Sequence, residues 1–192
     1  MNVRSGWLAV PGFICIAALA TMLSVYSGAS SPQGNAPEQP VAFRHTIHVD
    51  TLKMSCLYCH FSANRSPDPG LPAVGTCMGC HSVIATGSPE VKKLAAYWNK
   101  KEAVPWVRIH KLPEYVHFPH MRHVNAGVTC QTCHGQVQKM TQVYQAASLN
   151  MGWCINCHVN GYNAVAGKLA AGYTPTAADS AAPVKRARYD CS

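Results

Sequence analysis

One pentapeptide pattern, Cys-x-x-Cys-His, occurs four times in this chain of 192 residues and uses eight of its ten cysteines. In such a motif the two thiols form thioether bonds to a porphyrin, and the adjacent histidine binds the iron. Structural zinc sites also use paired cysteines, but they do not require a histidine directly after each pair. A disulfide framework would explain the even cysteine count and leave the histidines unexplained. The pattern therefore predicts four covalently bound haem c groups.

These motifs give two sets of candidate residues. The thioether-forming cysteines are Cys56, Cys59, Cys77, Cys80, Cys130, Cys133, Cys154 and Cys157. The proximal iron ligands are His60, His81, His134 and His158.

A second pattern, Phe-x-His-x-x-His, precedes the first and the third of these motifs. It begins at Phe43 in one case and at Phe118 in the other. Two histidines three residues apart lie on one side of a helical turn but diverge by about 60°, so each is expected to reach a different iron. The predicted distal ligands are His45, His48, His120 and His123. With both axial positions filled at every iron we expect no catalytic residue.

The recurrence of these two patterns indicates an internal duplication of a dihaem module, with halves at about residues 43–81 and 118–158. Only 12% of residues are charged and 8% are aromatic, so the porphyrins would supply much of the apolar interior. We therefore predict a mainly α fold with much irregular structure, a multihaem cytochrome c domain built on its haems over residues 43–192.

The N-terminal 27 residues are predicted to form a transmembrane anchor or an uncleaved signal. Arg4 precedes an apolar stretch from Trp7 to Tyr26, which at about 20 residues is long enough to cross a bilayer. Gly28-Ala29-Ser30 leaves open the alternative of a cleaved signal peptide. Residues 28–42 are rich in Ser, Gly, Pro, Gln and Asn and are predicted to be a flexible linker. Both alternatives place the haem domain on the periplasmic side of the cell inner membrane.

Two helices are predicted outside the haem motifs. Ser88-Pro89-Glu90 is typical of a helix start, and this helix should run to about Lys101. A second helix is expected from about Gln136 to Ala147, because apolar residues recur there at helical spacing. The net charge of +8 does not indicate nucleic-acid binding, since four haems carry about eight propionates that would offset it.

The chain ends in Tyr189-Asp190-Cys191-Ser192, which reads as the beginning of a further haem motif. His110 is surplus to four irons. A joint interpretation is that the natural protein continues past Ser192, that Cys191 attaches a fifth haem, and that His110 is its distal ligand. The alternative is an unpaired terminal cysteine, with His110 exposed or bonded to a propionate.

The layout of histidine pairs and haem motifs resembles class III cytochromes c, of the c3/c7 type. That resemblance implies that the first histidine of each pair serves the haem just after it, while the second reaches another haem. Residues 108–120, 127–135 and 151–154 are similar to the membrane-anchored multihaem cytochrome subunit of alternative complex III, which typically has five haems. This family's role implies iron–sulfur, quinol-oxidising membrane subunits as electron donor, and a downstream cytochrome c or terminal oxidase as acceptor.

Three functions compete. The first is an electron-transfer subunit with no substrate site of its own. The second is a tetrahaem quinol dehydrogenase feeding a periplasmic reductase, but there the first haem motif follows the anchor closely, whereas here about 30 residues intervene. The third is a catalytic multihaem reductase, which needs an iron with an open face, and the number of histidines argues against it. We expect the first.

Overall fold

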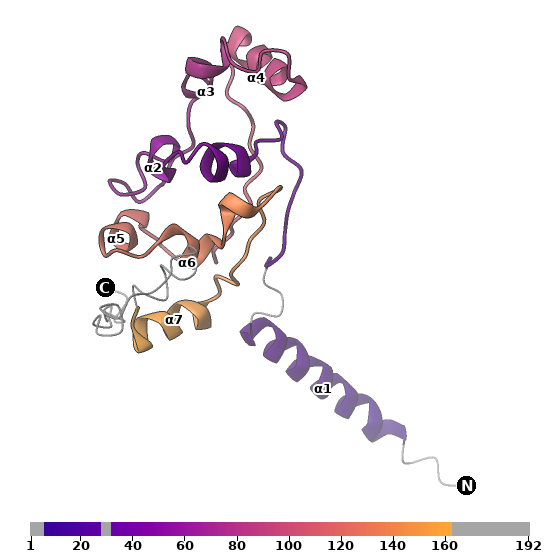
Figure 1. The fold of residues 1–192 in the computed structure, drawn as a ribbon. Coiled ribbons are helices and arrows are strands. Elements are labelled where there is room, and N and C mark those ends of the chain that lie inside the picture. The colour runs from indigo at the N-terminus through magenta and orange to yellow at the C-terminus, as the bar shows by residue number, and fades with distance from the viewer. Residues whose placement is uncertain (1–5, 28–31, 163–192) are drawn as a thin grey trace.

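The computed structural model describes residues 6–27 and 32–162, which are helical or irregular. The elements, in chain order, are α1 (Gly6–Ser27), the π-helical turn η1 (Thr46–Thr51), α2 (Cys56–Cys59), α3 (Val74–His81), α4 (Pro89–Lys100), α5 (His120–Asn125), α6 (Cys130–His134), the 3-10 turn η2 (Val137–Lys139) and α7 (Met151–Asn160). Figure 1 shows α3 and α4 at one end of the domain and α7 at the other, with α2, α5 and α6 between them. The predicted mainly helical, irregular architecture is confirmed.

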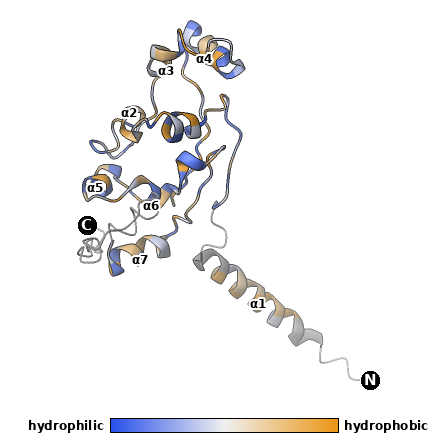
Figure 2. Cartoon of the chain, in the orientation of Figure 1, coloured by the Kyte–Doolittle hydropathy of each residue, from blue (hydrophilic) through white to orange (hydrophobic). Residues whose placement is uncertain are grey.

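α1 stands apart from the other helices in Figure 1. Several of its large apolar side chains are exposed, among them Phe13, Ile14 and Met22, and Figure 2 colours the middle of this helix toward hydrophobic. Within the described residues, no helix combines the length and the apolar character needed to cross a membrane, so the transmembrane helix predicted for residues 1–27 is not supported.

α4 forms where the sequence predicts it. Ser88 is its N-cap in extended conformation and Pro89 is the first helical residue, where a missing N–H costs nothing. The helix ends because Lys101 adopts a left-handed conformation with φ of 58°. Leu94 of this helix is buried and forms a small core with Val41 and Val104. Trp98, on the same helix, is half exposed.

The helix predicted from Gln136 to Ala147 is wrong. Only Val137–Lys139 forms a short 3-10 turn, and the chain is extended again at Met140. The segment that follows pairs with the chain around residues 33–36: Gly34 N–H donates to the Gln145 carbonyl (2.7 Å), and Gln145 N–H donates to the Asn35 carbonyl (3.1 Å). Pairing with a distant segment has overridden the helical apolar spacing. Residues 33–42 of the predicted linker also lie on the domain, since Gln39 exchanges hydrogen bonds with Val107.

Gln145 is the one polar side chain that is fully buried among the described residues, and its amide bonds three backbone groups in two segments. Its Oε1 accepts from Lys111 N–H (3.0 Å), and its Nε2 donates to the carbonyls of Ala147 (3.1 Å) and Ser148 (3.2 Å). The side chain therefore ties the segment before α5 to the segment before α7.

Gln145→Leu is expected to lower the free energy of unfolding by about 2–4 kcal/mol, because the three hydrogen bonds of a fully buried side-chain amide are lost. Denaturant unfolding of the haem-loaded protein measures this change. Gln142→Leu is the matched control: Gln142 is exposed and its side chain donates one hydrogen bond, to the Ala36 carbonyl. The control should cost less than about 1 kcal/mol. Equal effects of the two substitutions would contradict the role of Gln145.

Candidate haem-binding sites

The four Cys-x-x-Cys-His motifs all lie on short helices: α2, α3, α6 and α7. On a helix, residues three apart share one face, so each motif presents its two thiols on the same side. Two of the helices begin at a capping side chain. Ser55 Oγ accepts from Leu57 N–H before α2, and Asn150 Oδ1 accepts from Trp153 N–H (2.8 Å) before α7. No disulfide joins the cysteines in the described part of the chain.

The attachment sites form a row whose order differs from the sequence. A hydrogen bond shared by the Cys56 and Cys130 thiols lowers the pKa of Cys56 and raises that of Cys130, so the first and third sites adjoin. Burial and the neighbouring Cys59 raise the pKa of Cys77, which places the second site beside the first.

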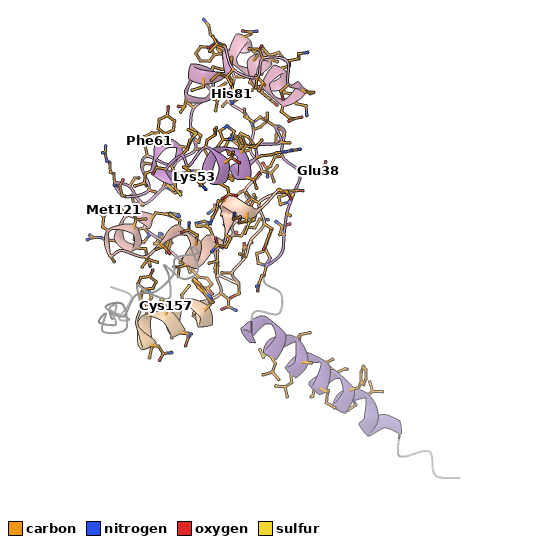
Figure 3. The ribbon with its side chains drawn as sticks, in the orientation of Figure 1. Glu38, Lys53, Phe61, His81, Met121 and Cys157 are labelled. Carbon is orange, nitrogen blue, oxygen red and sulfur yellow. The ribbon has the colours of Figure 1, made fainter. Side chains whose placement is uncertain are left out.

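At the other end of the row, cysteines of the third and fourth sites are also neighbours. Burial, together with Cys157 and Cys154, raises the pKa of Cys133 to about 11, so the fourth site lies next to the third. The order is therefore second, first, third, fourth, and Figure 1 shows the helices α3, α2, α6 and α7 in that sequence. Figure 3 labels two residues of the outermost sites, His81 and Cys157, at opposite ends of the domain.

The two Phe-x-His-x-x-His segments have the same geometry in both halves, and the leading phenylalanine explains why. Phe43 stacks on His48, with ring centroids 4.5 Å apart, and meets His45 edge-on at 4.8 Å. Phe118 stacks on His123 at 4.3 Å and meets His120 edge-on at 4.8 Å. One aromatic ring thus orients two imidazoles that point to different places.

Three of the four predicted distal histidines face a motif histidine at a similar distance between ring centroids. The ring centroids are 6.0 Å apart for His48 and His81, 6.4 Å for His120 and His134, and 6.0 Å for His123 and His158.

Two imidazoles on opposite sides of one metal have ring centres about 6 Å apart, since each bond is about 2 Å and each nitrogen lies about 1.1 Å from its ring centre. The spacing of the three pairs therefore fits an iron between the two rings.

The remaining distal candidate, His45, lies beside His60. Burial, with His60 and His48 nearby, lowers the pKa of His45 to about 4. Its Nδ1 is buried and has no hydrogen-bond partner within the described part of the chain. The ring is thus held as a neutral imidazole, the form that binds a metal.

The surfaces next to the motifs are apolar and exposed. Tyr58, between the cysteines of the first motif, is 56% exposed, and Ile155 in the fourth motif is 49% exposed. Val159, directly after His158, is exposed as well. Such side chains beside paired thiols fit a flat apolar group that would cover them. Together with the facing histidines, they make the residues present suitable for haem c.

Most of the motif histidines and predicted distal histidines place Nδ1 within hydrogen-bonding distance of a backbone carbonyl. Nδ1 of His60 lies 2.9 Å from the Gly70 carbonyl, and Nδ1 of His81 lies 3.0 Å from the Ile84 carbonyl. On the distal side, Nδ1 of His48 lies 3.0 Å from the Arg44 carbonyl. A bond of this kind fixes which nitrogen is free to bind a metal and in what direction it points.

α5, which carries both predicted distal histidines of the second half, docks on a loop of the first half. His120 directs both its backbone N–H (3.1 Å) and its Nδ1 (3.0 Å) to the Pro67 carbonyl. Asn125 Nδ2 donates to the Asn64 carbonyl (3.1 Å). The sequence gives no sign of this loop, because the contacts are made by backbone carbonyls, which every residue type has.

His110 contacts a motif histidine, His134. Its Nε2 lies 3.1 Å from Nδ1 of His134, with ring centroids 4.3 Å apart, and burial lowers the pKa of His110. Burial, His110, His120 and His60 lower the pKa of His134 to about 3. Cys191, the predicted attachment point of a fifth haem, lies outside the described residues. The fifth haem and a role of His110 as its ligand stay predictions.

Residues 116–182 match the family model described as cytochrome c7 and related cytochrome c. The chain is also similar to the menaquinone reductase, multiheme cytochrome c subunit, of Nitratidesulfovibrio vulgaris (strain Hildenborough). The two are 29% identical over 145 residues, which cover 64% of this chain and 69% of that protein.

Proposed function

Because the chain carries a cytochrome c7-like multihaem c-type cytochrome domain, we propose that it is an electron-transfer subunit of a quinone-linked membrane complex. The observation that carries the proposal is the row of four attachment sites, with axial histidine pairs spaced for iron along it. When bound, haem c supplies one-electron transfer and binds no substrate if both axial positions are taken. The chain's contribution is to attach, space and orient these groups, and it is not itself the enzyme.

The residue assignments of the proposal follow the facing pairs. His45 and His60 serve the first site, and His48 and His81 the second; His120 and His134 serve the third, and His123 and His158 the fourth. Each histidine pair then serves both haems of its own half. This assignment agrees with the class III resemblance, in which the first histidine of each pair serves the haem just after it.

The partners in this proposal are membrane subunits with a quinone site and an iron–sulfur centre, as in alternative complex III, and a downstream cytochrome c or oxidase. We place the haem domain on the periplasmic side, because c-type haem is attached outside the cytoplasm. The exposed apolar side chains of α1 support attachment to a membrane or a membrane subunit. Alternatively, the similarity to a menaquinone reductase subunit favours the opposite direction, in which electrons reach the quinone through this chain.

Purifying the native complex and identifying its co-migrating subunits tests the proposal. With the complex in hand, menaquinol should reduce the haems of this chain if the direction is that of alternative complex III. If a reduced periplasmic cytochrome reduces them and menaquinol does not, the reductase direction holds. Isolation of the native protein without any membrane partner would contradict both directions.

The four motifs predict at least four covalent c-type haems per chain. The alkaline pyridine haemochrome spectrum, referenced to protein concentration, should give this ratio, and the intact mass should rise by four haem additions. Replacing Cys154 and Cys157 by alanine should remove one addition, whereas Cys15→Ser should remove none. Two or fewer haems in the unaltered chain would be incompatible with the assignment.

A further inference from the structure

His134 has an unusual partner for its second ring nitrogen. His60, His81, His48 and His120 direct Nδ1 to backbone carbonyls. Nδ1 of His134 instead faces Nε2 of His110, at 3.1 Å. The two rings meet edge to face, with an interplanar angle of 78°. At His134 a side chain, and therefore a replaceable group, stands where these four histidines use the main chain.

The direction of this hydrogen bond follows from the role of His134. If Nε2 of His134 faces the iron opposite His120, then its Nδ1 carries the ring proton and donates. Nε2 of His110 must accept, and the proton of His110 sits on its own Nδ1. An imidazole nitrogen accepts more strongly than a peptide carbonyl, so His134 becomes the more electron-donating ligand.

The backbone at His110 is held firmly enough to give this contact a fixed geometry. Lys111 N–H donates to Oε1 of the fully buried Gln145 (3.0 Å), and Arg108 Nε donates to the His110 carbonyl (3.1 Å). Both bonds hold the peptide group that joins His110 to Lys111, directly beside the ring. His117, seven residues on, has an exposed side chain and offers a comparison within the same segment.

We propose that His110 is a positioning residue for His134: it accepts the Nδ1–H hydrogen bond, fixes the orientation of the ring and lowers the reduction potential of the third site. The proposal rests on the proposed haem ligation by His134. It assigns His110 a role that differs from that of distal ligand to a fifth haem, because the nitrogen that would bind an iron is engaged by His134.

The test uses the haem-loaded full chain with His110→Ala and with His117→Ala as the matched control. A redox titration followed by EPR resolves the low-spin ferric signals. In His110→Ala every haem should stay low-spin, one signal should shift in g value, and the midpoint potential of that haem alone should rise. His117→Ala should leave all signals and potentials in place. His110→Gln, whose side-chain oxygen can accept the bond, should restore the original values in part.

The affected haem is identified by a second substitution. His120 faces His134, so the low-spin signal that disappears in His120→Ala is the one that must shift in His110→Ala. A new high-spin signal in His110→Ala would overturn the proposal and make His110 an iron ligand. Unchanged signals and potentials would also overturn it. A chain without bound haem in the pyridine haemochrome assay would mean that the proposed function has failed instead.

Discussion

His120→Ala is expected to convert one haem of the ferric protein from low-spin to high-spin and to leave the others low-spin. The His120 ring faces His134 with a centroid separation of 6.4 Å and an interplanar angle of 16°. Removing one of two strong-field ligands leaves an open axial position, which water or nothing fills. EPR and the charge-transfer absorption of ferric high-spin haem measure the change.

The assignment of His120 to the third site can be tested separately from its role as a ligand. In a chain that already lacks Cys130 and Cys133, His120→Ala should create no further high-spin haem. His123→Ala in that chain should still create one, since His123 faces His158 in the fourth site, with ring centroids 6.0 Å apart. If the spectrum of His120→Ala matched that of the unaltered protein, the ligand role would be wrong.

The second large effect is on folding. The chain without haem is expected to lose most of its tertiary structure. Buried apolar side chains are few among the described residues: Val41, Ala63, Leu94, Val104, Met140 and Leu149. Helices as short as α2 and α6, with four and five residues, are unstable on their own. The axial histidines and thioether bonds supply the missing contacts, as metal binding does in zinc fingers.

Replacing all eight motif cysteines by serine prevents covalent attachment and reveals this dependence. The far-UV circular dichroism of that variant should fall well below the signal of the haem-loaded chain, and a protease should cut it rapidly between residues 43 and 158. Cys15→Ser, the control outside the motifs, should behave like the unaltered protein. A cooperative unfolding transition in the variant, with native helix content, would disprove the dependence.

The facing histidine pairs show which features the spacing of residues in the sequence predicts and which it does not. Histidines three apart were expected to diverge, and they do, because helical geometry is local. Which motif histidine each would face depends on how α5 and η1 dock on other segments. For α5 the docking partner is the loop around Pro67, more than fifty residues earlier in the chain.

The helix predicted after Gln136 does not form, and the reason is again a contact with a distant segment. Its apolar spacing is helical, but Gln145 exchanges backbone hydrogen bonds with residues 34 and 35. A local stretch of sequence cannot reveal a pairing between segments so far apart in the chain. α4 forms as predicted because its start signals are local: Ser88 at the N-cap and Pro89 at the first helical position.

The sequence by itself predicted the cofactor chemistry, the attachment residues and the duplicated module, because thioether formation needs a fixed local motif and a repeat is visible as spacing. Only the tertiary structure decided the order of the motifs in space, which predicted distal histidine faces which motif histidine, and the contact between His110 and His134. Those features depend on which distant segments meet, and this is set by backbone hydrogen bonds and packing across the two halves rather than by neighbouring residues.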